Sequence, residues 1–166
     1  MARGFSETEK QMIKQRLMEV GRKHFVQFGL KKTGIRELTS AVGISQGAFY
    51  LFYRSKEELF FELLMQEESR IRSSLFETGW HKQRLTKQAF KQFILNSLKL
   101  IDDNPLIKTL FLSENFEQLW RSLPEEVKDE HEQQDEELIL SIINFWYQQG
   151  WIKRTQPQAL GLTIRS

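Results

Sequence analysis

The chain has 166 residues and no cysteine, so disulfides and thiolate metal sites are excluded, and its length suffices for one compact domain or a small domain with a larger body. The net charge of +2 is unevenly distributed. Residues 1–56 carry eleven Lys and Arg against four Glu, whereas residues 57–166 carry thirteen Lys and Arg against eighteen acids. A basic N-terminal part on an acidic body predicts that one end of the protein is attracted to phosphates, as in nucleic acid.

Hydropathy excludes two further classes of protein. The N-terminal sequence MARGFSETEK has no apolar run of signal-peptide length, and no stretch approaches the roughly 18 apolar residues of a membrane span. We therefore expect a soluble, cytoplasmic protein that has no membrane partner.

The first predicted helix begins at the capping box Ser6 to Glu9 and ends at Gly29. Its apolar residues recur at helical spacing, which predicts the face that supports the elements after it. That face consists of Ile13, Leu17, Val20, His24 and Phe28, and Phe25 widens it.

Residues 33–53 predict two short helices around a tight turn. Thr33 is the expected N-cap of the first helix, and Gly43 supplies the left-handed residue that ends it. Ser45 is the expected cap of the second helix, which is predicted over residues 45–53. Two helices joined by a turn of three or four residues with a glycine form a helix-turn-helix motif.

The second of these helices opens with short or hydrogen-bonding residues where a core helix would carry leucines. A Gln can pair with an adenine edge, a Gly lets the backbone come close, and an Ala can contact a thymine methyl group. Phe49 and Phe52 are expected to face inward and Tyr50 outward. The opening residues are Ser45, Gln46, Gly47 and Ala48.

Ser55 to Glu58 is a second capping box and opens a helix to about Glu77, on the order of 30 Å long. Further helices are predicted over residues 86–102, from 105 to about 116–119, and from 124 to 149. No stretch alternates with a period of two for long enough to form a strand. The predicted fold class is all-α.

Residues 33–60 resemble the DNA-binding domain of the TetR family of bacterial transcriptional repressors. The resemblance implies a three-helix head in residues 1–56, with the motif at 33–53, and a helical effector-binding and dimerisation body in residues 57–166. It further implies that the long fourth helix transmits movement from body to head. The matching residues are Thr33, Ile35-Arg36-Glu37-Leu38, Gly43-Ile44-Ser45, Gly47, Phe49-Tyr50 and Ser55-Lys56-Glu57-Glu58-Leu59.

The resemblance also implies which residues meet DNA. Thr33 and Lys56 are expected at helix N-termini, where free N–H groups and the helix dipole favour an anion. Arg36 and Arg54 are additional phosphate candidates, and the alternative is that these residues are caps and solvated surface. The implied base contacts are Gln46, Gly47 and Ala48 with Ser45 at their edge, and the implied phosphate contacts are Thr33, Tyr50 and Lys56.

The body contains aromatic residues that could line a pocket for a small apolar or cationic effector. Aromatic residues at helical spacing are also ordinary core, which is the competing interpretation for each of them. That a pocket exists follows mainly from the resemblance. The candidates are Phe90, Phe93, Phe111, Phe116, Trp120, Phe145 and Trp146.

The sequence Thr155 to Pro157 indicates another helix, whose apolar stripe has barely begun at Ser166. Members of the family usually continue with two long helices that pair between subunits. The resemblance therefore implies a homodimer, and we expect the body to be C-terminally incomplete.

His131 and Asp135, four residues apart on one predicted helix, could supply half a metal site. Residues 125–137 contain eight acids and one Lys, so a solvated helix face is the favoured interpretation. No P-loop, GxSxG or HExxH sequence is present, and we expect neither an enzyme nor a cofactor.

The preferred functional interpretation is a ligand-responsive transcriptional regulator that acts as a repressor. It would bind a palindromic operator through the helix at 45–53 and be released by a small apolar effector. The alternative is a helical adaptor that does not bind DNA and that docks other proteins on its acidic helix and aromatic body.

Overall fold

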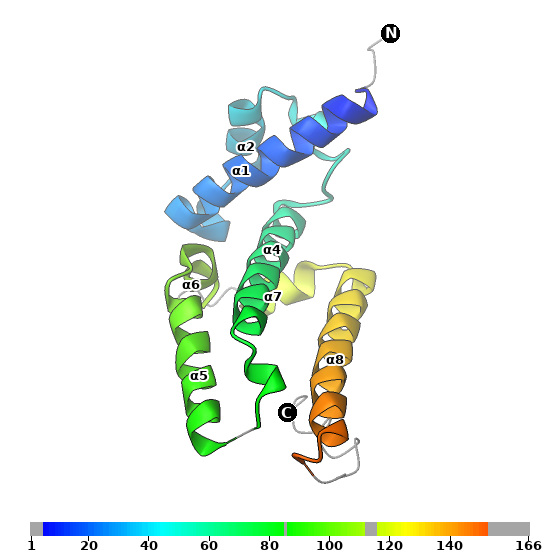
Figure 1. Ribbon diagram of the computed structural model, residues 1–166. Coiled ribbons are helices and arrows are strands. Elements are labelled where there is room, and N and C mark those ends of the chain that lie inside the picture. Colours follow the sequence, from blue (N-terminus) through cyan, green and yellow to red (C-terminus); the bar gives the residue numbers. More distant parts are fainter. Residues whose placement is uncertain (1–4, 85, 112–115, 153–166) are drawn as a thin grey trace. The chain divides into compact units, whose positions relative to one another are not determined.

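The computed structural model describes residues 5–84, 86–111 and 116–152. None of these residues lies in a strand, which confirms the all-α fold. No helix among them is long and apolar enough to cross a membrane. The helices, shown in Figure 1, are α1 (Glu7–Lys32), α2 (Ile35–Val42), α3 (Gln46–Phe49), α4 (Lys56–Glu77), the 3-10 turn η1 (Trp80–Lys82), α5 (Lys87–Asp102), α6 (Pro105–Phe111), α7 (Phe116–Ser122) and α8 (Glu125–Gln148).

Two predictions about the later part of the chain need comment. In the stretch predicted as one helix from 105 to about 116–119, the described residues form α6 up to Phe111 and α7 from Phe116 on, and the residues between them lie outside the described ranges. The predicted helix start at 155–157 and the expectation of a truncated body concern residues outside the described ranges.

α1 begins at the predicted capping box. The N–H of Glu9 donates to the Ser6 hydroxyl over 3.3 Å, and the N–H of Ser6 donates to the Glu9 carboxylate over 2.7 Å. Gly29 interrupts the helix with a φ of 76°, and residues 30–32 add one more turn. This last turn leads directly into the helix-turn-helix.

The buried face of α1 is shifted from the predicted stripe. Phe25 is fully buried, whereas Phe28 is 46% exposed. Gly21 explains the shift, because a Cβ at this position would lie only 3.1 Å from a side-chain carbon of Leu59. The missing side chain lets α4 approach α1 beside Gly21, one turn before Phe25.

The predicted N-cap of α2 is wrong by one residue. The N–H and the hydroxyl of Thr33 both donate to the carbonyl of Gly29, over 3.3 and 2.8 Å, so Thr33 closes α1. Gly34 is the N-cap of α2 and provides no side-chain bond. The first N–H groups of α2 therefore lack a side-chain acceptor at the cap.

The turn between α2 and α3 matches its prediction, but α3 is shorter than expected. Gly43 ends α2 with a φ of 83°, and the hydroxyl of Ser45 accepts from the N–H of Ala48 over 3.1 Å. α3 ends at Phe49 and not at residue 53, because the N–H groups of Leu51 and Phe52 donate to carbonyls three residues earlier and not to those four residues earlier, which forms a turn.

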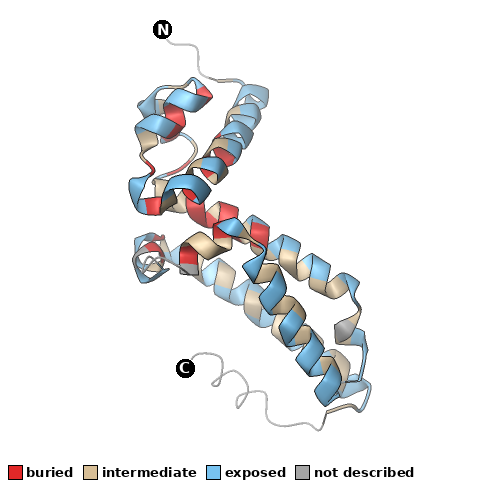
Figure 2. Cartoon of the chain, turned by 90° about the vertical axis from the view of Figure 1, so that its left-hand side faces the viewer, coloured by how far each residue is buried: buried red, intermediate tan, exposed pale blue. Residues whose placement is uncertain are grey.

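The core of the head joins α1, α2, α3 and the first half of α4. The rings of Phe25 and Phe60 meet edge to face with centroids 5.0 Å apart. Burial of each large apolar side chain contributes about 1.5–3 kcal/mol. In Figure 2 most of the buried positions belong to the part of the chain near the N-terminus, and those that are almost fully buried are Leu17, Phe25, Leu38, Phe49, Leu59, Phe60 and Leu63.

The chain divides into two compact units. The first comprises residues 1–72 and 98–124, and the second comprises residues 73–97 and 125–166. Helices α6 and α7 thus belong to the unit that holds the head, where Leu106 and Leu119 are buried. The functional division of the chain at residues 56 and 57 stays a prediction.

In the second unit, η1 is attached to α8. The indole N–H of Trp146 donates to the carbonyl of His81 over 2.8 Å, and the imidazole of His81 lies against the ring of Phe76 with centroids 4.6 Å apart. Burial lowers the pKa of His81, and the neighbouring Lys82 adds to this effect. Trp146 therefore has a packing role in this unit.

Candidate nucleic-acid interface

The first turn of α3 carries the predicted base-contacting residues on an open surface. Gln46 and Gly47 are exposed, and Ala48 is half-buried. A Cβ added to Gly47 would meet only the Ser45 hydroxyl, at 3.9 Å. The packing of this chain therefore leaves room for a side chain at 47, and the glycine keeps the surface open to close approach.

α3 is held in place by its far side. Phe49 is fully buried and Tyr53 nearly so, with ring centroids 5.8 Å apart. The Tyr53 hydroxyl donates to the sulfur of Met18 over 3.1 Å. Burial, followed by the nearby Glu62 carboxylate, raises the pKa of Tyr53 far above its usual range. The phenol thus stays neutral and anchors α3 to α1.

Tyr53 replaces one of the predicted anchors. Phe52 is only half-buried, whereas Tyr53 occupies the core. The sequence contains a signal for this, because Tyr53 follows Phe49 by four residues. Tyr50 is 58% exposed beside the predicted base-contacting residues, as expected.

The predicted phosphate-contacting residues differ in whether their hydrogen-bond donors already have partners within the protein. Both donors of Thr33 are used by Gly29, and its side chain is buried. Lys56 is half-buried, and its ammonium bonds main-chain carbonyls at the end of α1. Arg36 and Arg54 are exposed, the former in the first turn of α2. The exposed guanidinium groups are better placed for phosphates than the Thr33 hydroxyl.

The same unit contains a buried carboxylate. Glu67 of α4 is 6% exposed and accepts hydrogen bonds from Arg22 of α1, from Arg70 over 2.7 Å and from the Asn104 amide over 2.5 Å. Burial acts to raise the pKa of Glu67, but the hydrogen bonds from Arg22 and Asn104 and the charges of Arg22 and Arg70 lower it overall. Its sequence signal was an acid on the apolar stripe of α4.

A groove of about 750 Å³ lies between α1 and α4 in the first unit. It contains none of the predicted pocket residues. Sequence reasoning missed it, because its lining comes from two helices that are far apart in the chain. Its lining is Gln11, Lys14, Gln15, Met18, Glu19, Arg22, Lys23, Glu62, Leu63, Gln66 and Arg70.

The predicted pocket residues are divided between the two units. Phe116 and Trp120 belong to the first, with nearly parallel rings 6.1 Å apart, and Phe116 is 54% exposed. The side chain of Phe111 lies outside the described part of the structure. Those of the second unit are Phe90, which is exposed, and Phe93, Phe145 and Trp146, which are half-buried.

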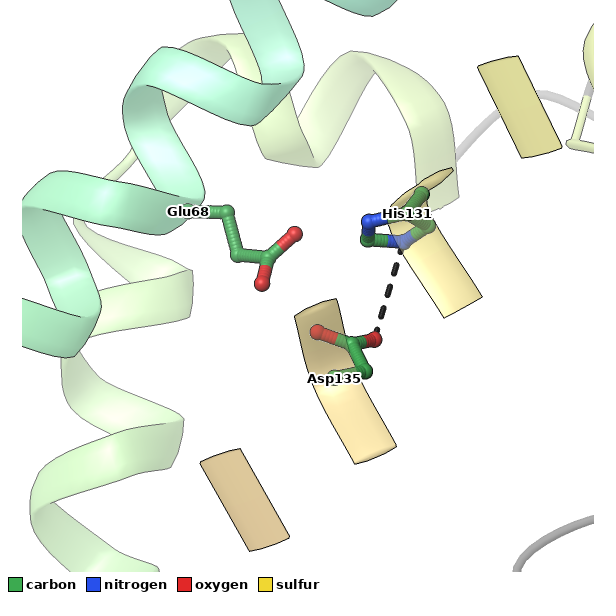
Figure 3. A group of neighbouring side chains, drawn as sticks. All are labelled: Glu68, His131 and Asp135. Carbon is green, nitrogen blue, oxygen red and sulfur yellow. Dashed lines mark ion pairs between the residues drawn. The ribbon is translucent and has the colours of Figure 1, made fainter. Parts of the chain in front are cut away.

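The candidate half metal site is a pair of side chains on α8. An imidazole nitrogen of His131 lies 3.7 Å from a carboxylate oxygen of Asp135, and Figure 3 shows the two side chains on the same helix. Glu68, also drawn there, belongs to the other unit. The ion pair fits the predicted solvated helix face, since it gives both side chains a partner when the histidine is protonated.

Comparison with known proteins relates the head to one family. A sequence profile described as "Bacterial regulatory proteins, tetR family" matches residues 17–63, which run from the middle of α1 to the first half of α4. The chain is 27% identical to the uncharacterized HTH-type transcriptional regulator YhgD of Bacillus subtilis over 72% of its own length and 67% of that protein. It is 32% identical to the HTH-type transcriptional repressor AcnR of Corynebacterium diphtheriae over 45% of its length and 39% of that repressor.

Solved structures extend the likeness to the fold. A putative TetR-family transcriptional regulator from Mesorhizobium loti, 18% identical, matches 91% of this chain and 76% of its own with a TM-score of 0.60. A putative TetR-family regulator from a Shewanella species, 20% identical, matches 89% of this chain and 76% of its own with a TM-score of 0.58. The matched profile and the helix-turn-helix on its anchored core make residues 17–63 similar to the TetR family of bacterial regulatory proteins, and the likeness of the longer chain to that family is one of fold.

Proposed function

We propose that the protein is a transcriptional regulator that acts as a repressor and binds a palindromic operator through α3. The observation that carries this proposal is the open first turn of α3. Gln46 and Gly47 are exposed on a helix that Phe49 and Tyr53 fix to the core, and no packing requires the glycine. Such a surface suits the floor of a major groove, where base edges are read at short range.

The electrostatics of the head support the same function. Residues 1–56 carry more Lys and Arg than Glu, so this part of the chain attracts the phosphates of a nucleic acid. We propose that Arg36, Arg54 and the Tyr50 hydroxyl contact phosphates. Backbone N–H groups in the first turns of α2 and α4, near Thr33 and Lys56, are further proposed donors to phosphate. Ser45 lies at the edge of the base-contacting set of Gln46, Gly47 and Ala48.

Base contact by Gln46 is tested in a mobility-shift assay on duplexes selected from a random pool, in which a palindrome is expected to emerge. Gln46→Ala should weaken binding to the selected site by about 5- to 150-fold, the equivalent of about 1–3 kcal/mol, and relax the base preference at one position. Gln133→Ala, which alters an exposed glutamine of α8, is the matched control and should leave affinity unchanged.

Salt dependence separates this function from that of a helical adaptor. Affinity for the selected duplex should fall by several powers of ten between 50 and 200 mM salt if roughly six to ten phosphates are contacted. An affinity that ignores salt, or that survives both Gln46→Ala and Tyr50→Ala unchanged, would support the adaptor instead.

We further propose that the regulator is a homodimer released by a small apolar or cationic effector held among the body helices. Of the predicted aromatic residues, Phe90, Phe93, Phe145 and Trp146, which belong to the second unit, are the proposed lining. An effector that favours a spacing of the two heads unlike that of successive half-sites would shift the population away from the bound form. If no compound in a screen raises the melting temperature or weakens DNA binding, the proposed effector is excluded. The proposal that the protein binds DNA is not affected by that result.

A further inference from the structure

We infer that Lys56 is a positioning residue for DNA binding, whose side chain braces the end of α1 and does not itself pair with a phosphate. The inference rests on the proposed function and concerns how the head is shaped for it. It assigns the ammonium group a structural target within the chain, which differs from the direct phosphate contact expected of a lysine at a helix N-terminus.

The ammonium of Lys56 has three acceptors in the last turn of α1. Its Nζ donates to the carbonyl oxygens of Leu30 over 2.7 Å, of Thr33 over 2.8 Å and of Lys31 over 3.3 Å. A lysine ammonium has three donors, so these bonds use all of them. A phosphate could take this group only in exchange for bonds that already exist.

The end of α1 needs such a partner. The last carbonyls of a helix have no N–H within the helix, and they carry the negative end of its dipole. At this end Gly29 has a φ of 76°, and its carbonyl already accepts both donors of Thr33. The carbonyls of residues 30, 31 and 33 are left over, and a cation is the donor that satisfies them most strongly.

The braced segment determines where α2 starts. Residues 30–33 run straight into Gly34, the N-cap of α2, which has no side chain to fix its own position. Lys56 is the first residue of α4, and its bonds cross 23 to 26 positions of sequence. They therefore fix the beginning of α2 relative to the beginning of α4, and with it the exposed guanidinium of Arg36.

The test begins with the free protein, where a residue that only pairs with phosphate has no effect. In Lys56→Met, amide hydrogen exchange at Thr33 and Leu38, whose N–H groups donate to the carbonyls of Gly29 and Gly34, should become at least about tenfold faster. The melting temperature should fall by several degrees. Lys56→Arg, which keeps the charge and the donors, should restore most of the protection. Lys32→Met, which removes a nearby exposed lysine, is the matched control and should leave exchange at Thr33 and Leu38 unchanged. If Lys56→Met does not fold, Lys56→Gln, with its shorter and neutral donor, should show a smaller acceleration at the same amides.

A double-mutant cycle on duplex DNA then connects the brace to binding. If Lys56 positions α2, the loss of affinity from Arg36→Met should be several-fold smaller in Lys56→Met than in the unaltered protein. Two independent phosphate contacts would instead give additive losses. Unchanged exchange in the free protein, or additivity in the cycle, overturns the inference even though the unaltered protein binds DNA. If the unaltered protein does not bind DNA, the proposed function is wrong. The role of Lys56 in DNA binding is then wrong as well.

Discussion

At the scale of single residues, α3 and the turn after it contain some side chains that stabilise the fold and others that do not. Phe49 and Tyr53 fill the core, and the Ser45 hydroxyl caps the helix. Gly47 does neither, since nothing but that hydroxyl lies within 4 Å of where its Cβ would be. A residue that lowers helix propensity without easing any packing is best explained by what approaches it from outside.

Gly47→Ala is therefore expected to separate stability from DNA binding. The free energy of unfolding should be unchanged or rise by up to about 1 kcal/mol, because alanine loses less backbone entropy in a helix. Affinity for the selected duplex should fall at least about tenfold, because the added methyl group holds the backbone away from the bases. Thermal denaturation and a mobility-shift assay measure the two effects.

Gly43→Ala provides the contrast to this variant. With a φ of 83° at this position, alanine should destabilise the fold by about 1 kcal/mol or more. Should Gly47→Ala bind DNA as tightly as the unaltered protein, the close approach at this glycine would be wrong.

At the scale of elements, Glu67 joins three helices of the first unit. Arg22 reaches it from α1, and Asn104 reaches it with its amide while its side-chain oxygen accepts from the N–H groups of Leu106 and Ile107, both over 3.1 Å. Asn104 is thus both the N-cap of α6 and a hydrogen-bond donor to the buried carboxylate of Glu67. The start of α6 is tied to α1 and α4 through these two side chains.

The lowered pKa of Glu67 predicts an acid-dependent loss of stability. A carboxyl group whose pKa is lower in the folded state stabilises the fold above its unfolded pKa of about 4.3, and this contribution disappears as the pH falls through the folded value. Melting temperatures measured from pH 7 down to pH 3 should therefore fall below about pH 4.3, and Glu67→Gln should flatten that part of the curve.

At neutral pH the same Glu67→Gln variant should be less stable, because the charged partners of Arg22 and Arg70 are lost. Glu68→Gln, which alters the neighbouring carboxylate paired with Arg72, is the control for a less buried acid. An acid profile identical in Glu67→Gln and the unaltered protein would show that another group dominates.

At the scale of the whole molecule, the two compact units and the uneven charge suggest how the parts are used. The unit that contains the basic head extends to α6 and α7, and the acidic stretch of α8 belongs to the other unit. A palindromic operator needs two heads on successive half-sites, so binding should require two chains.

Light scattering is expected to give twice the chain mass of 19.8 kDa for the free protein. Removing one half-site of the selected duplex should then weaken binding by far more than half, since the second head loses its contacts. A chain that remains monomeric and binds a single half-site with full affinity would contradict the dimer.

The limits of prediction from sequence follow from the distance between interacting residues. The capping boxes at Ser6 and Ser55 and the left-handed Gly43 use partners within a few residues, and these predictions were right about where the helices begin or end. Thr33 was misassigned because a threonine between two helices can cap either, and the choice depends on the path of the chain after Gly29. The bonds of Lys56, and those of Glu67 with Arg22 and Asn104, join residues 23 to 45 positions apart, a pairing that no local pattern displays.

The distribution of tryptophans gives the protein a built-in spectroscopic reporter. Of the four tryptophans, only Trp120 falls in the residue ranges of the first unit, and its indole lies edge-on to the ring of Phe61 on α4, with centroids 6.2 Å apart. The difference in emission between the unaltered protein and Trp120→Phe therefore isolates the fluorescence of the head's own unit. A movement of α7 against α4 would change this signal, so the proposed binding of DNA or of an effector can be tested for such a movement without attaching a dye.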